Sequence, residues 1–126
     1  MTDPTVVVEL FRDLQNETKE KLIAISVDAK LKIITFEVVS IGSVSAISLR
    51  PFEILRTPVV VNAFGVILVH NHPSGDPKPS AEDKKLTKTV AKLADSGGIA
   101  FHDHIIIGDD DHYSFRTAGL LDKKTK

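Results

Sequence analysis

The stretch VILVHNHPSGDPKPSAED, residues 66–83, decides how the rest of the chain is arranged. Its apolar start, residues 66–69, predicts a buried strand that delivers His70 at its carboxyl end. The loop that follows, residues 73–79, holds three prolines and a glycine, so it cannot continue the strand. Ser80 then begins a helix, and the stretch as a whole predicts a strand, a loop and a helix in close succession.

Three side chains in this stretch are suited to binding one divalent metal ion: His70, His72 and Asp83. One residue separates the two histidines, and because Pro73 ends the strand, both imidazoles can converge on one point. Two nitrogens and one carboxylate leave a fourth position open on a tetrahedral zinc ion, as in catalytic rather than structural zinc sites. We therefore predict a catalytic metal site here.

The same residues have an explanation that needs no metal. Two loop histidines need not share a ligand, and Ser80 with Asp83 matches a capping box, in which both residues cap the first turn of their own helix. The two roles are compatible, because one carboxylate oxygen can accept a backbone N–H while the other faces a metal ion.

Glu37 is the predicted general base for hydrolysis at such a metal. It interrupts the apolar strand sequence IITFEVV, residues 33–39, and burying a carboxylate there is costly unless it is paired or functional. The alternative is a strand face open to water, where a glutamate is unremarkable. Glu37 lies 33 residues before His70, so only the fold decides whether the two meet.

A second pair of histidines with the same spacing, His102 and His104, precedes the apolar residues 105–107. On a strand, both imidazoles would lie on one face of the sheet. No helical carboxylate follows at a comparable distance, and the aspartates at 109–111 are typical of a polar turn. We therefore expect a structural or surface role for this pair, with a second metal site as the alternative.

The rest of the chain alternates between predicted helices and strands. Helices are predicted over residues 4–15, 51–63 and 80–97, and strands over residues 22–27, 31–39, 44–49, 66–69 and 100–107. Pro58 predicts a kink or a restart within the second helix. This alternation predicts an α/β or α+β fold in which a single mixed β-sheet is layered with helices, in one domain over residues 1–126.

Composition narrows the classes of function. The formal net charge is −1, so no overall positive charge draws the chain to nucleic acid. Cysteine is absent, which excludes disulfides, iron–sulfur clusters and thiolate zinc sites. The longest apolar stretch, residues 59–69, is too short to span a bilayer, and no signal peptide is evident. We expect a cytoplasmic protein with no membrane partner.

The motif residues resemble those of a known family. Glu37, His70-x-His72-Pro73, Ser80 and Asp83 are similar to the JAMM motif of the MPN-type metalloproteases, in which ten residues separate the second histidine from the aspartate. The resemblance is closer to the bacterial RadC-type branch. It covers nearly the whole chain from about residue 22, through the segments GS at 42–43, RPxEI at 50–54, HNHPSGDP at 70–77, PS at 79–80, DHIIIG at 103–108 and GLL at 119–121.

This resemblance implies an MPN-like fold, similar in architecture to the cytidine deaminases, and a zinc-dependent hydrolase of peptide or isopeptide bonds. It implies His70, His72 and Asp83 as the zinc ligands. It implies Glu37 as the base that accepts a proton from the attacking water, and Ser80 as the donor to the oxyanion. The helix-hairpin-helix region that usually precedes this domain in the family is expected to be absent from these residues.

Three other classes of function compare less well with the sequence. A zinc deaminase requires cysteine ligands, which the chain lacks. A DNA-repair factor, which the RadC name suggests, is disfavoured by the net charge and by the lack of a basic face with interleaved aromatic residues. A non-catalytic metal-binding or interaction domain stays open, because a complete set of ligands does not prove turnover. The substrate and the oligomeric state are not predicted.

Overall fold

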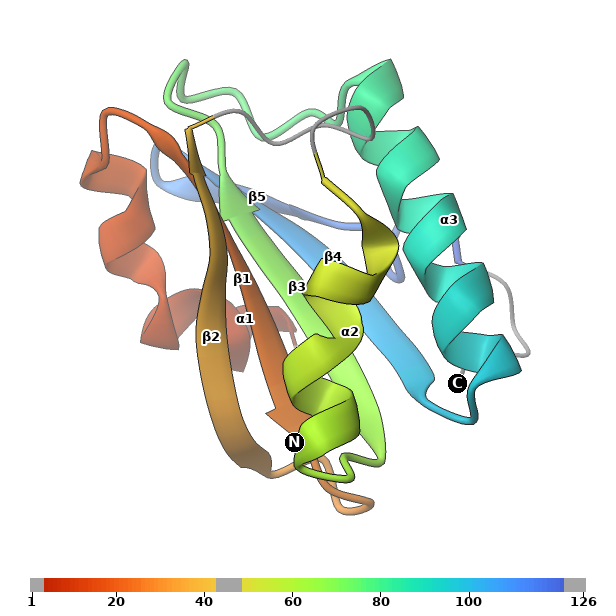
Figure 1. The fold of residues 1–126 in the computed structure, drawn as a ribbon. Coiled ribbons are helices and arrows are strands. Elements are labelled where there is room, and N and C mark those ends of the chain that lie inside the picture. Colours follow the sequence, from red (N-terminus) through yellow and green to blue (C-terminus); the bar gives the residue numbers. More distant parts are fainter. Residues whose placement is uncertain (1–3, 43–48, 122–126) are drawn as a thin grey trace.

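A five-stranded mixed β-sheet forms the centre of the fold (Figure 1). The computed structural model describes residues 4–42 and 49–121. The strands lie in the order β2 (Ile33–Gly42), β1 (Glu20–Val27), β3 (Gly65–Asn71), β4 (Ala100–Gly108) and β5 (Asp111–Ser114). β3 and β4 are parallel, and the other neighbouring pairs are antiparallel. The predicted mixed sheet is therefore confirmed.

Helices cover both faces of this sheet (Figure 1). α2 (Pro51–Val60) and α3 (Ala81–Ser96) pack on one face, and α1 (Pro4–Leu10) with the 3₁₀ helix η1 (Arg12–Asn16) packs on the other. None of the helices within residues 4–42 and 49–121 combines the length and the hydropathy needed to cross a membrane. The three layers match the expected α+β architecture.

The neighbouring strands β1 and β3 are buried on both faces of the sheet, because alternate side chains enter different apolar clusters. Leu22 and Leu68 pack in the cluster formed with α2 and α3. Ile23 and Ile67 pack in the cluster formed with α1 and η1. This double burial explains why both strands appear in the sequence as nearly continuous apolar runs rather than as an alternation.

The strand directions bring the end of β3, the start of β1 and the start of α3 to the same end of the sheet. His70 lies near the end of β3 and is paired with Leu22 of β1. Because β1 is antiparallel to β3, its first residue, Glu20, lies at the end of the sheet where β3 ends. The loop after β3 leads to α3, which starts at the same end of the sheet (Figure 1).

The predicted capping box at the start of α3 is confirmed. The hydroxyl oxygen of Ser80 accepts the backbone N–H of Asp83 at 3.0 Å, and the Asp83 carboxylate accepts the backbone N–H of Ser80 at 2.8 Å. These reciprocal bonds satisfy two backbone donors at the helix start. They also fix the carboxylate of Asp83 in the first turn.

The extents of several elements differ from the prediction. The first helix ends at Leu10 and is followed by η1, so it does not run unbroken through the predicted range. The second strand extends to Gly42. α2 continues through Pro58 and ends at Val60 rather than at residue 63, so of the two predicted effects of Pro58, a kink or a restart, the restart is wrong. The predicted segment 44–49 lies, apart from its last residue, outside the described residues.

Candidate metal centre

The end of β3, the loop after it and the start of α3 bring His70, His72 and Asp83 into contact. Nε2 of His70 lies 3.1 Å from Nε2 of His72. The Asp83 carboxylate bridges the two rings, with Oδ1 at 3.3 Å from Nε2 of His70 and Oδ2 at 3.0 Å from Nε2 of His72. The structure thus gathers at one point the three side chains singled out in the sequence as metal ligands.

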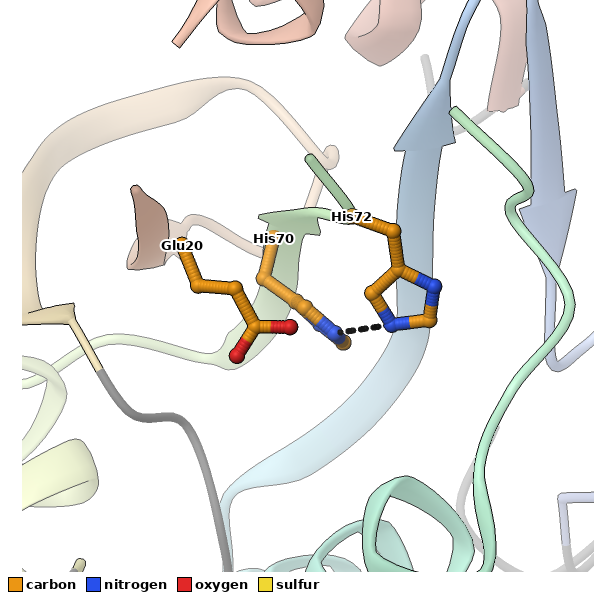
Figure 2. Close-up of side chains that lie close together, drawn as sticks. All are labelled: Glu20, His70 and His72. Atoms are coloured by element: carbon orange, nitrogen blue, oxygen red, sulfur yellow. Dashed lines mark hydrogen bonds between the residues drawn. The ribbon is translucent and has the colours of Figure 1, made fainter. Parts of the chain in front are cut away.

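Glu20 joins this cluster, although the sequence argument did not select it. Ligand atoms of Glu20, His70 and His72 all lie within 4.8 Å of one another. Figure 2 shows the Glu20 carboxylate directed toward the two imidazoles. The signal available in the sequence was its position just before the apolar run 22–27, because an antiparallel neighbour of β3 starts where β3 ends.

Glu37 does not join the cluster. Its position on β2 is level with Leu68 rather than with the end of β3, and β1 lies between the two strands. Its carboxylate accepts a hydrogen bond from the Thr57 hydroxyl at 2.5 Å and lies 3.7 Å from the Arg56 guanidinium. The structure therefore pairs Glu37 with α2 and places Glu20, instead of Glu37, beside the imidazoles.

The hydrogen bonds of His72 orient its second nitrogen toward the cluster. Nδ1 of His72 lies 2.9 Å from the carbonyl oxygen of Asp76, which can only accept, so Nδ1 carries a proton. The neutral ring then presents the lone pair of Nε2 to the Asp83 carboxylate, and two electron-rich groups so close together repel each other unless a cation or a proton lies between them. Imidazole and carboxylate donors without thiolates suit zinc and other first-row divalent ions, so this set fits a metal ion.

The charge of Asp83 is stabilised by its surroundings. Burial alone would raise its pKa, but the contacts with the His70 and His72 imidazoles and the hydrogen bond from the backbone N–H of Ser80 outweigh burial and hold the pKa of Asp83 well below its usual range. The contact with the Asp83 carboxylate in turn raises the pKa of His72. Asp83 is therefore an anion across the physiological pH range, as a metal ligand must be.

An open cleft of about 510 Å³ leads from solvent to this cluster. Glu20, His72, Ser80 and Asp83 lie in its wall, together with the proline-rich loop that precedes α3. His70 is fully buried, whereas His72 is 12% exposed. The cleft therefore connects solvent with Glu20, His72 and Ser80.

The second histidine pair is buried, so the expected surface role is wrong, whereas a structural role fits. His104 lies fully buried behind His70, with its Nε2 at 2.7 Å from Nδ1 of His70. His102 is 8% exposed, and burial lowers the pKa of both His102 and His104. Within the part of the chain that the structure describes, neither belongs to a further group of three metal-ligating side chains. Thr87 of α3 and Phe115 cover His104, whereas Phe64 stacks on His102, and the sequence pattern did not specify these contacts.

The loop that carries His72 packs against Gly108 so closely that a methyl group does not fit. A Cβ atom on Gly108 would overlap the carbonyl oxygen of Gly75 and lie 2.8 Å from Cδ of Pro77. We expect Gly108→Ala to lower the free energy of unfolding by about 1–3 kcal/mol and to weaken metal binding by displacing the loop. Gly97→Ala is the matched control, because its nearest contact would be 3.6 Å. Chemical denaturation compares the two, and equal stabilities would show that the loop relaxes freely.

Comparisons with known proteins agree with this fold. A family model described as a RadC-like JAB domain matches residues 1–120. A UPF0758 protein of Protochlamydia amoebophila is 43% identical over 86% of this chain and 47% of its own length. UPF0758 proteins of Aquifex aeolicus and Methanosarcina mazei are 36% and 39% identical over 94% and 89% of this chain, and over 52% and 49% of their own lengths.

The fold and the clustered histidines and carboxylates define a JAB-type domain, a class that includes zinc metallohydrolases. Within that class, the chain belongs to the RadC family, which confirms the resemblance seen in the sequence. The chain spans about half the length of the curated relatives that it matches.

Proposed function

We propose that this domain is a zinc-dependent hydrolase that cleaves an amide bond in a peptide or isopeptide. The observation that carries the proposal is the contact between two imidazole Nε2 atoms and one buried carboxylate beside an open cleft. Zinc bound there would lower the pKa of a water molecule to about 7 and polarise the carbonyl group that the water attacks.

The two carboxylates of the cluster have different surroundings, and we assign them different roles. Asp83 is 3% exposed, touches both imidazoles and is fixed by the backbone of Ser80, so it would complete the ligand set with His70 and His72. Glu20 is partly exposed and lines the cleft from which substrate and water enter. Glu20 would therefore accept the proton of the attacking water and deliver it to the leaving amine.

Ser80 is positioned to serve both the helix and the reaction. Its hydroxyl oxygen accepts the N–H of Asp83 through one lone pair, and this bond does not use the hydroxyl hydrogen. Because Ser80 lines the cleft, that hydrogen would be donated to the oxyanion formed when the carbonyl is attacked. Losing such a donor typically raises the barrier by about 3 kcal/mol.

The proposal is tested with protein that has been stripped of metal by a chelator. Isothermal titration with zinc is expected to show one ion per chain. The zinc-loaded and metal-free proteins are then incubated with a peptide library and with a lysine-isopeptide library, and the products are identified by mass spectrometry. We expect cleavage only in the presence of zinc, lost with chelator and restored by added zinc.

Two results would contradict the proposal in different ways. Failure to bind zinc would remove the metal centre. Stoichiometric zinc binding without cleavage in either library would leave a metal-binding domain without hydrolytic turnover.

A further inference from the structure

His104 and Thr87 extend the metal cluster into the core through a chain of three hydrogen bonds. Nδ1 of His70 lies 2.7 Å from Nε2 of His104, and Nδ1 of His104 lies 2.5 Å from the hydroxyl oxygen of Thr87. That hydroxyl lies 2.7 Å from the backbone carbonyl oxygen of Asp83. This hydrogen-bond chain thus begins at one side chain of the cluster and returns to the backbone of another, and all of its side chains are buried.

The last acceptor fixes the direction of every bond in the chain. The carbonyl oxygen of Asp83 can only accept, so the Thr87 hydroxyl donates its single hydrogen there. Thr87 is then an acceptor toward His104, and Nδ1 of His104 must carry a proton. A second proton on His104 would place a charge between two neutral partners in the core, which is costly, so its Nε2 accepts the Nδ1–H of His70.

We propose that His104 and Thr87 are positioning residues that hold His70 as the Nδ1–H tautomer and so keep its Nε2 lone pair available for the metal. Histidine ligands ordinarily make this second bond to a carboxylate, a backbone carbonyl or water. In this protein the partner of His70 is the imidazole of His104, whose own tautomer is fixed by the hydroxyl of Thr87. A neutral imidazole in water favours the opposite tautomer, with the proton on Nε2. The buried hydrogen bonds therefore reverse the tautomer preference of His70. The role at a metal rests on the proposed function, whereas the tautomer does not.

The competing explanation is that His104 only fills space. Its ring stacks on Phe115 with centroids 4.9 Å apart and planes 9° apart, as a packing residue would. In that case a ring of similar shape would replace it, and the tautomer of His70 would be indifferent to the Thr87 hydroxyl. The two explanations therefore differ in what happens when single hydrogen-bonding groups are removed without a change of shape.

Long-range ¹H–¹⁵N NMR correlations of the metal-free protein report the tautomers directly. We expect His70, His72 and His104 all to be protonated on Nδ1 in the wild-type protein. Thr87→Val keeps the branched shape but removes the acceptor of His104, and it is expected to shift His104 and His70 away from that tautomer. Thr87→Ser should restore it. The proposal is overturned by a His70 that carries no proton on Nδ1 in the wild type or by an unchanged His70 in Thr87→Val.

Zinc titration provides the second readout. Thr87→Val and His104→Phe are each expected to bind zinc about 10–100-fold more weakly than the wild type, as is typical when a partner of a metal-bound histidine is removed. Thr89→Val is the matched control, because Thr89 lies on the exposed side of the same helix and its hydroxyl donates to the carbonyl of Lys85, away from the cluster. Wild-type affinity in Thr87→Val and His104→Phe would overturn the positioning role.

Failure of this inference and failure of the proposed function are distinguishable. A wild-type protein with the expected tautomers that binds no zinc would overturn the proposed function and leave the hydrogen-bond chain standing. Equal zinc affinity in Thr87→Val and the wild type, with zinc-dependent cleavage intact, would overturn the role of the chain and leave the hydrolase standing.

Discussion

Glu20→Gln is expected to lower the rate of hydrolysis by about 10²- to 10⁴-fold while zinc remains bound. The carboxamide is similar in size to the carboxylate but cannot accept the proton of the attacking water. The proposed ligands, His70, His72 and Asp83, are unchanged by the substitution. The measurement is kcat on a peptide cleaved by the wild type, together with zinc affinity from calorimetry.

Glu37→Gln is the matched control, since it makes the same chemical change in the same sheet. Its carboxylate contacts Thr57 and Arg56 of α2, so we expect turnover within a few-fold of the wild type. The opposite pattern, with Glu37→Gln inactive and Glu20→Gln active, would return the role of base to the residue that the sequence motif suggested. A loss of zinc in Glu20→Gln would instead make Glu20 a ligand.

The difference between Glu20 and Glu37 shows where sequence reasoning reaches its limit. Both carboxylates border or interrupt apolar strands, and both lie far before His70 in the chain. Which of them meets the imidazoles depends on the order and register of β2, β1 and β3. Register is a long-range property set by packing on both faces of the sheet, and a local pattern does not specify it.

Features that depend on near neighbours were predictable. The capping box of Ser80 and Asp83 follows from residues three apart, and the strand that delivers His70 follows from its apolar run and the proline that comes after it. The burial of His104 was not predictable in the same way. Its strand was expected, but whether its face met solvent or α3 depended on where the helix after the proline-rich loop came to lie.

Asp83→Asn is expected to weaken zinc binding by at least about 100-fold, because partners beyond the direct ligands alone typically contribute about 10–100-fold. The asparagine side chain can still accept the N–H of Ser80, so the helix cap is largely kept. The substitution removes the negative charge of the Asp83 carboxylate, which contacts both His70 and His72. Calorimetric titration of zinc into the metal-free variant measures the effect.

Ser80→Ala is the control that separates the cap from the charge. It removes the acceptor of the Asp83 N–H and is expected to lower the free energy of unfolding by about 0.5–2 kcal/mol, with zinc affinity within a few-fold of the wild type. Its turnover should still fall, because the proposed oxyanion donor is gone. Asp83→Asn with wild-type zinc affinity would remove Asp83 from the ligand set.

The pH dependence of stability gives Asp83→Asn a second signature in the metal-free protein. A carboxyl group whose pKa is lower in the folded than in the unfolded chain stabilises the fold above the unfolded value, about 3.9, and this contribution is lost as the pH falls through the folded value. Asp83→Asn should therefore unfold more easily than the wild type at pH 7, and the difference should shrink as the solution is acidified below about pH 4. A constant difference between pH 7 and pH 2 in urea denaturation would mean that the substitution acts through packing rather than through the charge of Asp83.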